Sequence, residues 1–140
     1  MESIDYFNMP RGFRTARIAS KRSEFGLHPR SNHGACLFKG SRVISFGFNK
    51  RKTHPIVSKF TMAVDGRNRF VAIHAELNCI LGLDISLTEG TTMYVWRESS
   101  DGTPLISKPC EMCEVLLKQA EIKKVIYTIS QEPYYSQLVF

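Results

Sequence analysis

The stretches HAE at residues 74–76 and PCEMC at residues 109–113 decide how this chain folds and what chemistry it can perform. One imidazole and two thiols of this kind form a ligand set that zinc binds well. Structural zinc sites usually fill all four tetrahedral positions with protein groups, whereas three protein ligands leave one position open for water. The pattern therefore predicts a hydrolytic zinc site with His74, Cys110 and Cys113 as ligands.

Glu76 stands two residues after the predicted imidazole ligand, so its carboxylate can reach a water at the metal without binding the metal itself. A carboxylate in that place can accept a proton and then deliver it to a ring nitrogen or to a leaving amine. We therefore predict that Glu76 is the general acid and base of the reaction.

Each half of the pattern also has an ordinary interpretation. A Cys-x-x-Cys pair in a reducing compartment can be a redox pair, and a single histidine on an apolar helical face is often a packed core residue. The joint pattern, with its proline before Cys110, favours the metal site. The other cysteines, Cys36 and Cys79, lie in apolar settings and are expected to be buried free thiols. A second zinc site that combines one of them with His28 or His33 matches no strong spacing template.

The pairing of H-x-E with P-C-x-x-C is a signature of zinc deaminases that act on cytosine or adenine. The chain resembles the cytidine and deoxycytidylate deaminase superfamily over residues 13–129, and residues 73–78 are especially similar to the deoxycytidylate group. The other segments that carry the resemblance are residues 34–38, 43–49, 92–96 and 122–127. The resemblance implies an α/β fold with three α-β-α layers, a central mixed sheet of about five strands, and a zinc site at the N-termini of two helices.

Hydrophobic periodicity and turn residues place the elements along the chain. Apolar residues at helical spacing predict helices at residues 13–22, 70–81 and 110–120, with Gly82 ending the second helix. Strands are predicted at residues 35–38, 43–48, 91–96 and 125–129, and loops at residues 49–69 and 97–108. Because this length suits one core and no linker or repeat divides it, residues 1–140 are predicted to form a single domain.

Two features depart from the deoxycytidylate deaminases. The predicted loop at residues 97–108 is longer than the link that the family often has before its Pro-Cys. Only eleven residues follow residue 129, too few for the crossover helix and parallel strand with which those enzymes usually continue. Residues 131–133 could instead turn the chain back so that residues 134–140 pair antiparallel, an arrangement similar to that of free-nucleoside cytidine deaminases. The sequence leaves the direction of this last strand open.

The composition is that of a globular, soluble protein, with 43% hydrophobic and 23% charged residues. No apolar run approaches the roughly 20 residues that span a membrane, and the first residues do not resemble a signal peptide, so a cytoplasmic location without a membrane partner is expected. The net charge of +6 is uneven, because residues 1–59 hold 12 Lys and Arg against 3 Asp and Glu and the remainder holds 7 against 10. The basic half predicts either a bound anion, such as a nucleotide phosphate or a nucleic-acid backbone, or a solvated surface.

The resemblance also implies substrate contacts. It puts the backbone N–H of Ala75 on the pyrimidine carbonyl and Asn49 on the sugar, although Asn49 could equally be a strand-end turn residue. Trp96 is a candidate for stacking on the base, but a single aromatic residue on a strand is more often part of the core. The remaining candidates are His54, at the pocket entrance or in a solvated loop, and Lys50, Arg51, Lys52 and Arg97 as contacts of a substrate phosphate.

These features favour an enzyme with one zinc ion per chain that hydrolytically converts dCMP to the uracil nucleotide, with dCTP as a second candidate substrate. Deamination of cytosine or adenine in RNA or single-stranded DNA stays open as an alternative, as does deamination of free cytidine. A non-catalytic protein that keeps the zinc is a further alternative, which the intact Glu76 disfavours. By resemblance, we also expect a homo-oligomer and a nucleotide regulator.

Overall fold

Nine short helices and strands build the part of the chain that the computed structural model describes, residues 9–23, 31–49 and 74–140. The elements are α1 (Gly12–Ser20), β1 (Ser31–Lys39), β2 (Arg42–Phe48), α3 (Ala75–Ile80), α4 (Ile85–Thr88), β3 (Thr92–Ser99), α5 (Glu111–Gln119), β4 (Lys124–Thr128) and β5 (Tyr135–Val139).

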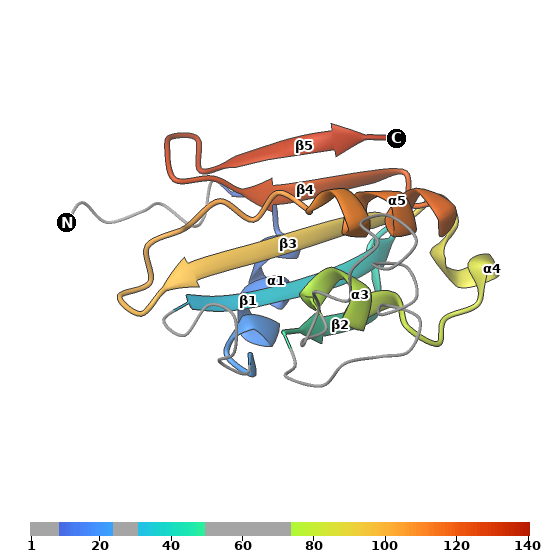
Figure 1. The fold of residues 1–140 in the computed structure, drawn as a ribbon, viewed down its shortest axis with the longest axis horizontal. Coiled ribbons are helices and arrows are strands. Elements are labelled where there is room, and N and C mark those ends of the chain that lie inside the picture. The colour runs from blue at the N-terminus through green and yellow to red at the C-terminus, as the bar shows by residue number, and fades with distance from the viewer. Residues whose placement is uncertain (1–8, 24–30, 50–73) are drawn as a thin grey trace, which may run out of the picture.

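The strands form one mixed sheet in the order β2-β1-β3-β4-β5. β1 pairs antiparallel with both β2 and β3, β4 pairs antiparallel with β5, and β3 and β4 are parallel because the α5 crossover joins them. Figure 1 shows α1 behind the sheet and α3 and α5 in front of it. The predicted α-β-α fold with a mixed sheet of five strands is confirmed.

Successive strand residues face opposite sides of the sheet, and this alternation divides the core into two clusters. The cluster under α3 and α5 includes Ala35, Leu37, Ala75, Met93, Val95, Leu117 and Val125. The cluster under α1 includes Phe13, Ala16, Cys36, Trp96 and Ile126. A residue at an odd-numbered position of β1 or β3 therefore faces α3 and α5, and an even-numbered one faces α1.

Two glycines let helices approach the β1–β2 hairpin closely. A Cβ atom at Gly34 would lie 2.3 Å from the carbonyl oxygen of Ala16 in α1. A Cβ atom at Gly47 would lie 2.4 Å from the backbone nitrogen of Cys79 and 2.6 Å from the carbonyl oxygen of Ala75, both in α3. Side chains larger than hydrogen at these positions would displace a helix from each face of the hairpin.

Several boundaries differ from the sequence predictions. β3 continues past Trp96 to Ser99, since residues 97–99 pair with β1 and Glu98 forms a further bridge with Pro104. α3 is described from Ala75, and the predicted helical residues 70–73 lie outside the described residues, as does most of the predicted loop at residues 49–69. The helix ends as predicted, with Gly82 in the left-handed conformation at φ +80°. The short helix α4 was not predicted.

The last strand returns antiparallel to its neighbour. The N–H of Tyr134 donates to the carbonyl of Gln131 at 2.7 Å, and the N–H of Ile129 donates to the carbonyl of Tyr134 at 3.0 Å, which closes the turn. β5 then pairs antiparallel with β4, from Thr128 opposite Tyr135 to Lys124 opposite Val139. The structure thus decides the direction of residues 134–140, which the sequence leaves open.

No helix in the described residues has both the length and the apolar character required to cross a membrane. The assignment of residues 1–140 to a single domain stays a prediction.

Candidate metal centre

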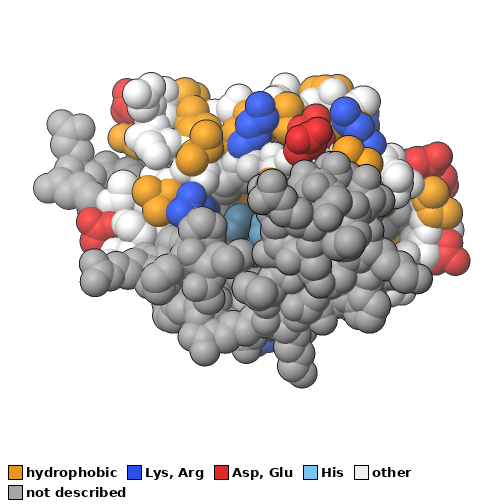
Figure 2. Space-filling model, in the orientation of Figure 1, with side chains coloured by type: hydrophobic (Ala, Val, Ile, Leu, Met, Phe, Trp, Pro, Cys, Tyr) orange, Lys and Arg blue, Asp and Glu red, His pale blue; other side chains and the backbone are white. Residues whose placement is uncertain are grey.

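Three donor atoms from distant parts of the chain meet at the starts of α3 and α5. His74 immediately precedes α3, Cys110 is the residue before α5, and Cys113 lies in the first turn of α5. The Nδ1 atom of His74 lies 3.7 Å from the Sγ atom of Cys110 and 3.4 Å from that of Cys113. Figure 2 shows histidine surface near the centre of the face that carries these two helices.

The spacing of the donors fits a tetrahedral zinc ion. Zinc–nitrogen and zinc–sulfur bonds of ordinary length put the two donor atoms about 3.6 Å apart at a tetrahedral angle, and the two nitrogen–sulfur distances lie on either side of that value. The ligand atoms all lie within 4.8 Å of one another, and they are the only such group of His, Cys, Asp or Glu in the described residues. One zinc ion therefore fits, with one coordination position left over.

The fold fixes the position of Cys110 from both sides. Its sulfur accepts a hydrogen bond from the backbone N–H of Cys113 at 3.5 Å and so caps the first turn of α5. On the other side, Ser107 anchors the preceding loop, because its hydroxyl donates to the carbonyl of Val95 at 3.0 Å and accepts the N–H of Thr128 at 2.8 Å. The Thr128 hydroxyl in turn donates to the carbonyl of Leu105 at 2.7 Å.

This buried Ser107–Thr128 network ties the loop after β3 to the carboxyl ends of both parallel strands. Neither residue is a candidate from the sequence, because an isolated serine or threonine has no distinguishing pattern. Their effect is to hold the loop just before Pro109 and Cys110, although it is longer than the family's usual link.

The two thiols titrate as a pair. The hydrogen bond with Cys113, together with the contacts with His74, outweighs burial and lowers the pKa of Cys110 to about 5. The pKa of Cys113 is raised well above its ordinary value, first by the hydrogen bond with Cys110 and then by burial. One thiolate is thus present at neutral pH, and a binding metal ion displaces the proton of the second thiol.

His74 is influenced by the same cluster. Burial alone would lower the pKa of its imidazole, but the hydrogen bond with Cys110 and the negative charge of Glu76 outweigh burial and raise it. Because a metal ligand is the neutral imidazole, metal binding works against this rise in the pKa of His74.

Glu76 lies in the first turn of α3 and is buried beside the three donors. Its Oε1 atom lies 3.0 Å from the Nε2 atom of His33 on β1, and its carboxylate also contacts the Cys113 thiol. Burial would raise the pKa of Glu76, but the interactions with His33 and His74 outweigh it and lower the pKa. The group is therefore a carboxylate next to the donor cluster without belonging to it.

The contact between His33 and Glu76 is absent from the sequence predictions, which consider His33 only as a ligand of a second metal. The alternation along β1 was the available signal, because it puts His33 on the same face as Ala35 and Leu37. That face becomes informative only when α3 is known to cover it.

Asn49 and Ala75 contact each other, in contrast to the separate substrate contacts that the resemblance implies. The backbone N–H of Ala75 donates to the Oδ1 atom of Asn49 at 2.8 Å, so it is already engaged. This bond satisfies one of the unpaired N–H groups at the start of a helix. A second bond, from the N–H of Phe48 to the Oδ1 atom of Asn78 at 3.0 Å, joins β2 and α3 in the opposite sense.

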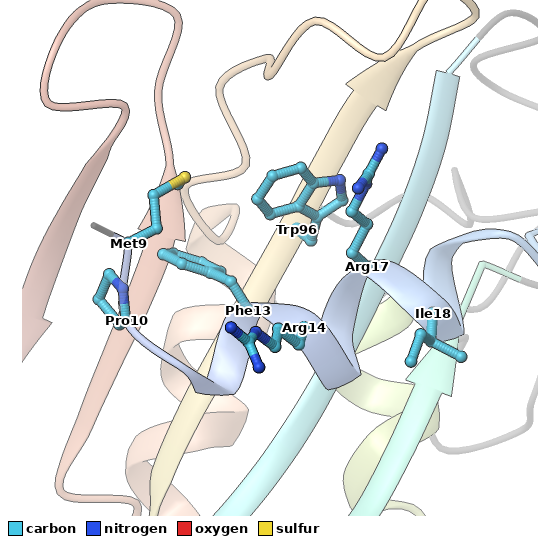
Figure 3. Close-up of a pocket in the computed structure, with 7 residues that line it drawn as sticks. All are labelled: Met9, Pro10, Phe13, Arg14, Arg17, Ile18 and Trp96. Atoms are coloured by element: carbon cyan, nitrogen blue, oxygen red, sulfur yellow. The ribbon is translucent and has the colours of Figure 1, made fainter. Parts of the chain in front are cut away.

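Trp96 does not face the metal centre, and its expected role in stacking on the base is wrong. As an even-numbered residue of β3 it points to the opposite side of the sheet, where it is buried against α1. Its ring centroid is 5.6 Å from that of Phe13, and the guanidinium carbon of Arg17 lies 5.7 Å from it. Figure 3 shows Trp96 beneath α1 beside these two residues. The other interpretation from the sequence, a core residue, is correct.

The remaining candidate contacts divide into two groups. Arg97 on β3 lies opposite His33 on β1 in the sheet register. By strand alternation, it belongs to the face of the metal centre. Its Nη1 atom donates to the carbonyl of Ile106 at 3.1 Å. His54, Lys50, Arg51 and Lys52 lie outside the described residues.

The predicted buried free thiols are confirmed, and they lie on opposite faces of the sheet. The Sγ atom of Cys36 contacts the carbonyl of Gly12 at 3.2 Å under α1, whereas that of Cys79 lies 3.2 Å from the hydroxyl of Ser45. Burial raises the pKa of both thiols, that of Cys79 to about 12. Neither joins a second metal-binding group in the described part of the chain, and His28 lies outside it.

Comparison with known proteins gives consistent matches over most of the chain. The zinc-binding region of the cytidine and deoxycytidylate deaminase family matches residues 10–129. The chain is 31% identical over 124 residues to the deoxycytidylate deaminase of Mycobacterium phage D29, which covers 80% of this chain and 87% of the phage protein. It is 28% identical over 131 residues to the deoxycytidylate deaminase of Homo sapiens, covering 88% of this chain and 66% of the human protein.

A solved structure shares the fold. The apo form of dCMP deaminase from the cyanophage S-TIM5 has a TM-score of 0.57 to this structure at 20% sequence identity, over 86% of this chain and 82% of the other.

Proposed function

The chain belongs to the cytidine and deoxycytidylate deaminase family, and we propose that it hydrolyses dCMP to dUMP and ammonia. The observation that carries the proposal is the buried Glu76 carboxylate beside the His74, Cys110 and Cys113 cluster. The choice of dCMP is supported by the phage and human relatives, which are both named deoxycytidylate deaminase. The cyanophage enzyme has also been solved with dCMP and dUMP.

The metal and the carboxylate would divide the chemistry between them. Zinc held by His74, Cys110 and Cys113 supplies a Lewis acid that makes water acidic near neutral pH. Glu76 accepts a proton as the water oxygen bonds to the ring carbon that bears the amine. It delivers this proton to the ring nitrogen, then takes the remaining proton from the added hydroxyl and passes it to the amine, which leaves as ammonia while the ring carbonyl forms.

Burial of the carboxylate suits this proton transfer. Glu76 is almost fully buried, so few solvent waters compete for its oxygens. Its pKa is held low by His33 and His74, so the carboxylate is ready to accept a proton at neutral pH.

We propose Arg97 as a contact of the substrate phosphate, because it shares the face of the metal centre and a guanidinium binds phosphate through paired N–H donors. Lys50, Arg51 and His54 remain proposed contacts from the sequence. Asn49 and Ala75 also remain proposed contacts of the sugar and the pyrimidine carbonyl. Use of the Ala75 N–H by a substrate requires that its bond to Asn49 open first.

The use of dCTP, assembly into a homo-oligomer, regulation by a nucleotide and a cytoplasmic location stay predictions. Each follows from the resemblance or the composition and has no support among the described contacts.

Ammonia release from the purified, zinc-loaded chain tests the function. We expect turnover of dCMP that a zinc chelator abolishes, with Glu76→Ala as the inactive control. The panel adds dCTP, cytidine, adenosine and a short single-stranded oligonucleotide. Turnover of the oligonucleotide alone would replace the proposal with nucleic-acid editing, and turnover of cytidine alone with a nucleoside deaminase. No turnover of any cytosine compound in the panel would contradict the proposed function and each of these cytosine-based alternatives.

A further inference from the structure

The imidazole of His33 on β1 contacts the proposed proton carrier. Its Nε2 atom lies 3.0 Å from Oε1 of Glu76, and the side chains are 14% and 2% exposed. Both atoms are buried, and within the described part of the chain neither makes a hydrogen bond of ordinary geometry. This ion-pair contact is therefore the polar interaction that joins the two buried atoms.

His33 is held by its backbone on a strand and not by a mobile loop. Its N–H donates to the hydroxyl of Ser23 at 2.9 Å, and its carbonyl accepts the N–H of Asn49 at 3.4 Å. The residue also pairs with Arg97 in the β1–β3 register. The imidazole thus projects from a rigid edge of the site toward α3.

The contact with His33 engages one of the two oxygens of the Glu76 carboxylate. Oε1 of Glu76 faces His33, while the carboxylate also contacts the thiol of Cys113 in the metal cluster. A donor on Oε1 restricts rotation of the carboxylate and keeps one oxygen directed toward the metal side, where proton transfer takes place. Partners of this kind commonly change activity by about 10- to 100-fold although they do not touch the reacting atoms.

We propose that His33 is a positioning residue for Glu76, donating its Nε2–H to Oε1 so that the other oxygen is directed toward the reacting water and amine. The inference rests on the proposed function, because it assigns His33 a part in the same reaction. It adds a residue that acts through Glu76 and contacts neither metal nor substrate.

The kinetic test compares His33→Leu, which fills the space without a donor, with His33→Gln, whose side-chain amide can donate to the same oxygen. In the zinc-loaded full chain, we expect His33→Leu to lower kcat for dCMP by about 10- to 100-fold with KM within about threefold of wild type. We expect His33→Gln to restore kcat to within about fivefold of wild type. Both variants should bind about one zinc per chain.

Asn32→Leu is the matched control, since it introduces leucine at the neighbouring strand position that faces the other side of the sheet. Wild-type kcat in His33→Leu would overturn the proposal, as would equal losses of kcat in the leucine and glutamine variants. If His33→Leu loses zinc or the folded state, His33→Gln alone tests the proposal. In that case a kcat of His33→Gln more than about fivefold below wild type would overturn it.

A spectroscopic measurement separates this inference from the proposed function. Nitrogen-15 NMR of the imidazole, assigned by the signals missing in His33→Gln, should show a proton on Nε2 of His33 whose resonance shifts in Glu76→Gln. An Nε2 atom without a proton would overturn the inference whatever the substrate is. A protonated, Glu76-dependent Nε2 in an enzyme that leaves dCMP untouched would contradict the substrate and leave the contact established.

Discussion

At the scale of single residues, the metal centre separates ligation from proton transfer. The soft thiols of Cys110 and Cys113 and the imidazole of His74 are suited to hold zinc. Glu76, two residues along the chain from a ligand, is directed at the cluster and stays outside the ligand group. The separation leaves a basic group free to carry protons while the metal stays bound.

Replacing Glu76 with alanine should therefore abolish turnover and keep the metal. We expect kcat for dCMP to fall by at least about 10²-fold, the lower end of the contribution of a general acid or base. Zinc measured by elemental analysis should remain at about one per chain. Glu111→Ala is the control, because that exposed carboxylate belongs to the same P-C-E-M-C motif. Activity near wild type in Glu76→Ala would remove its proposed role.

At the scale of elements, the metal centre depends on how two helix starts are docked against the sheet. α3 approaches β2 across Gly47, and the loop before α5 is held by Ser107 and Thr128 between β3 and β4. These contacts join segments that are far apart in the chain. Displacement of either helix start would move a ligand by more than the tolerance of a zinc bond, a few tenths of an ångström.

Replacement of Gly47 with alanine tests the docking of α3. The new Cβ atom would meet backbone atoms of Cys79 and Ala75, which cannot rotate away, so we expect a loss of about 1–3 kcal/mol in the free energy of unfolding. His74 immediately precedes α3, so a shift of α3 would also move this zinc ligand. Zinc affinity should therefore fall too. Urea denaturation and zinc titration measure the two effects.

Gly12→Ala is the comparison for this substitution. Its Cβ atom would crowd the ring of Tyr94 under α1, on the face away from the metal. It should lower stability without changing zinc affinity. Equal effects of Gly12→Ala and Gly47→Ala on zinc affinity would show that general destabilisation, and not helix position, controls the metal.

Replacement of Thr128 with valine tests the loop anchor. The change keeps the side-chain shape and removes the hydroxyl, leaving the carbonyl of Leu105 without this donor in a buried position. We expect the free energy of unfolding to fall by about 1–3 kcal/mol, with weaker zinc binding. Thr128→Ser keeps the hydroxyl and should lose less stability. If urea denaturation gave the same stability for both, the hydrogen bonds would not be what anchors the loop.

At the scale of the whole molecule, a zinc ion would join the two helices on one face of the sheet. His74 belongs to the start of α3 and the two cysteines to the start of α5, so a bound ion links segments that the unfolded chain holds apart. Binding to the folded chain alone stabilises it by mass action.

Removal of the metal should therefore lower the thermal stability of the whole chain. With free zinc at about 1,000 times its dissociation constant, the stabilisation is about 4 kcal/mol, which corresponds to a shift in Tm on the order of 10 °C for a domain of this size. Calorimetry with and without a chelator measures the shift. In Cys110→Ser the chelator should have little effect on Tm. A wild-type Tm that the chelator leaves unchanged would contradict a zinc ion that links the two helices.

The sequence by itself determined the donor set, the family and the order of all helices and strands except α4, and it singled out Glu76 as the proposed proton carrier. These properties depend on residue identity and on spacing within short segments: two thiols one helical turn apart, a carboxylate beside an imidazole, and apolar residues at helical or strand periods. The direction of the last strand was left open, because too few residues for a crossover excludes one arrangement without selecting the antiparallel pairing that the structure shows.

Only the tertiary structure decided which face of the sheet each strand residue occupies and what lies across from it. Alternation tells which residues of one strand share a face, but not that His33 on β1 and Trp96 on β3 face opposite ways, nor that the first meets α3 and the second α1. Likewise, the bond between Asn49 and the N–H of Ala75 arises only when β2 and α3 dock. Such contacts are collective, since they depend on how helices pack on both faces at once, and no short stretch of sequence contains that information.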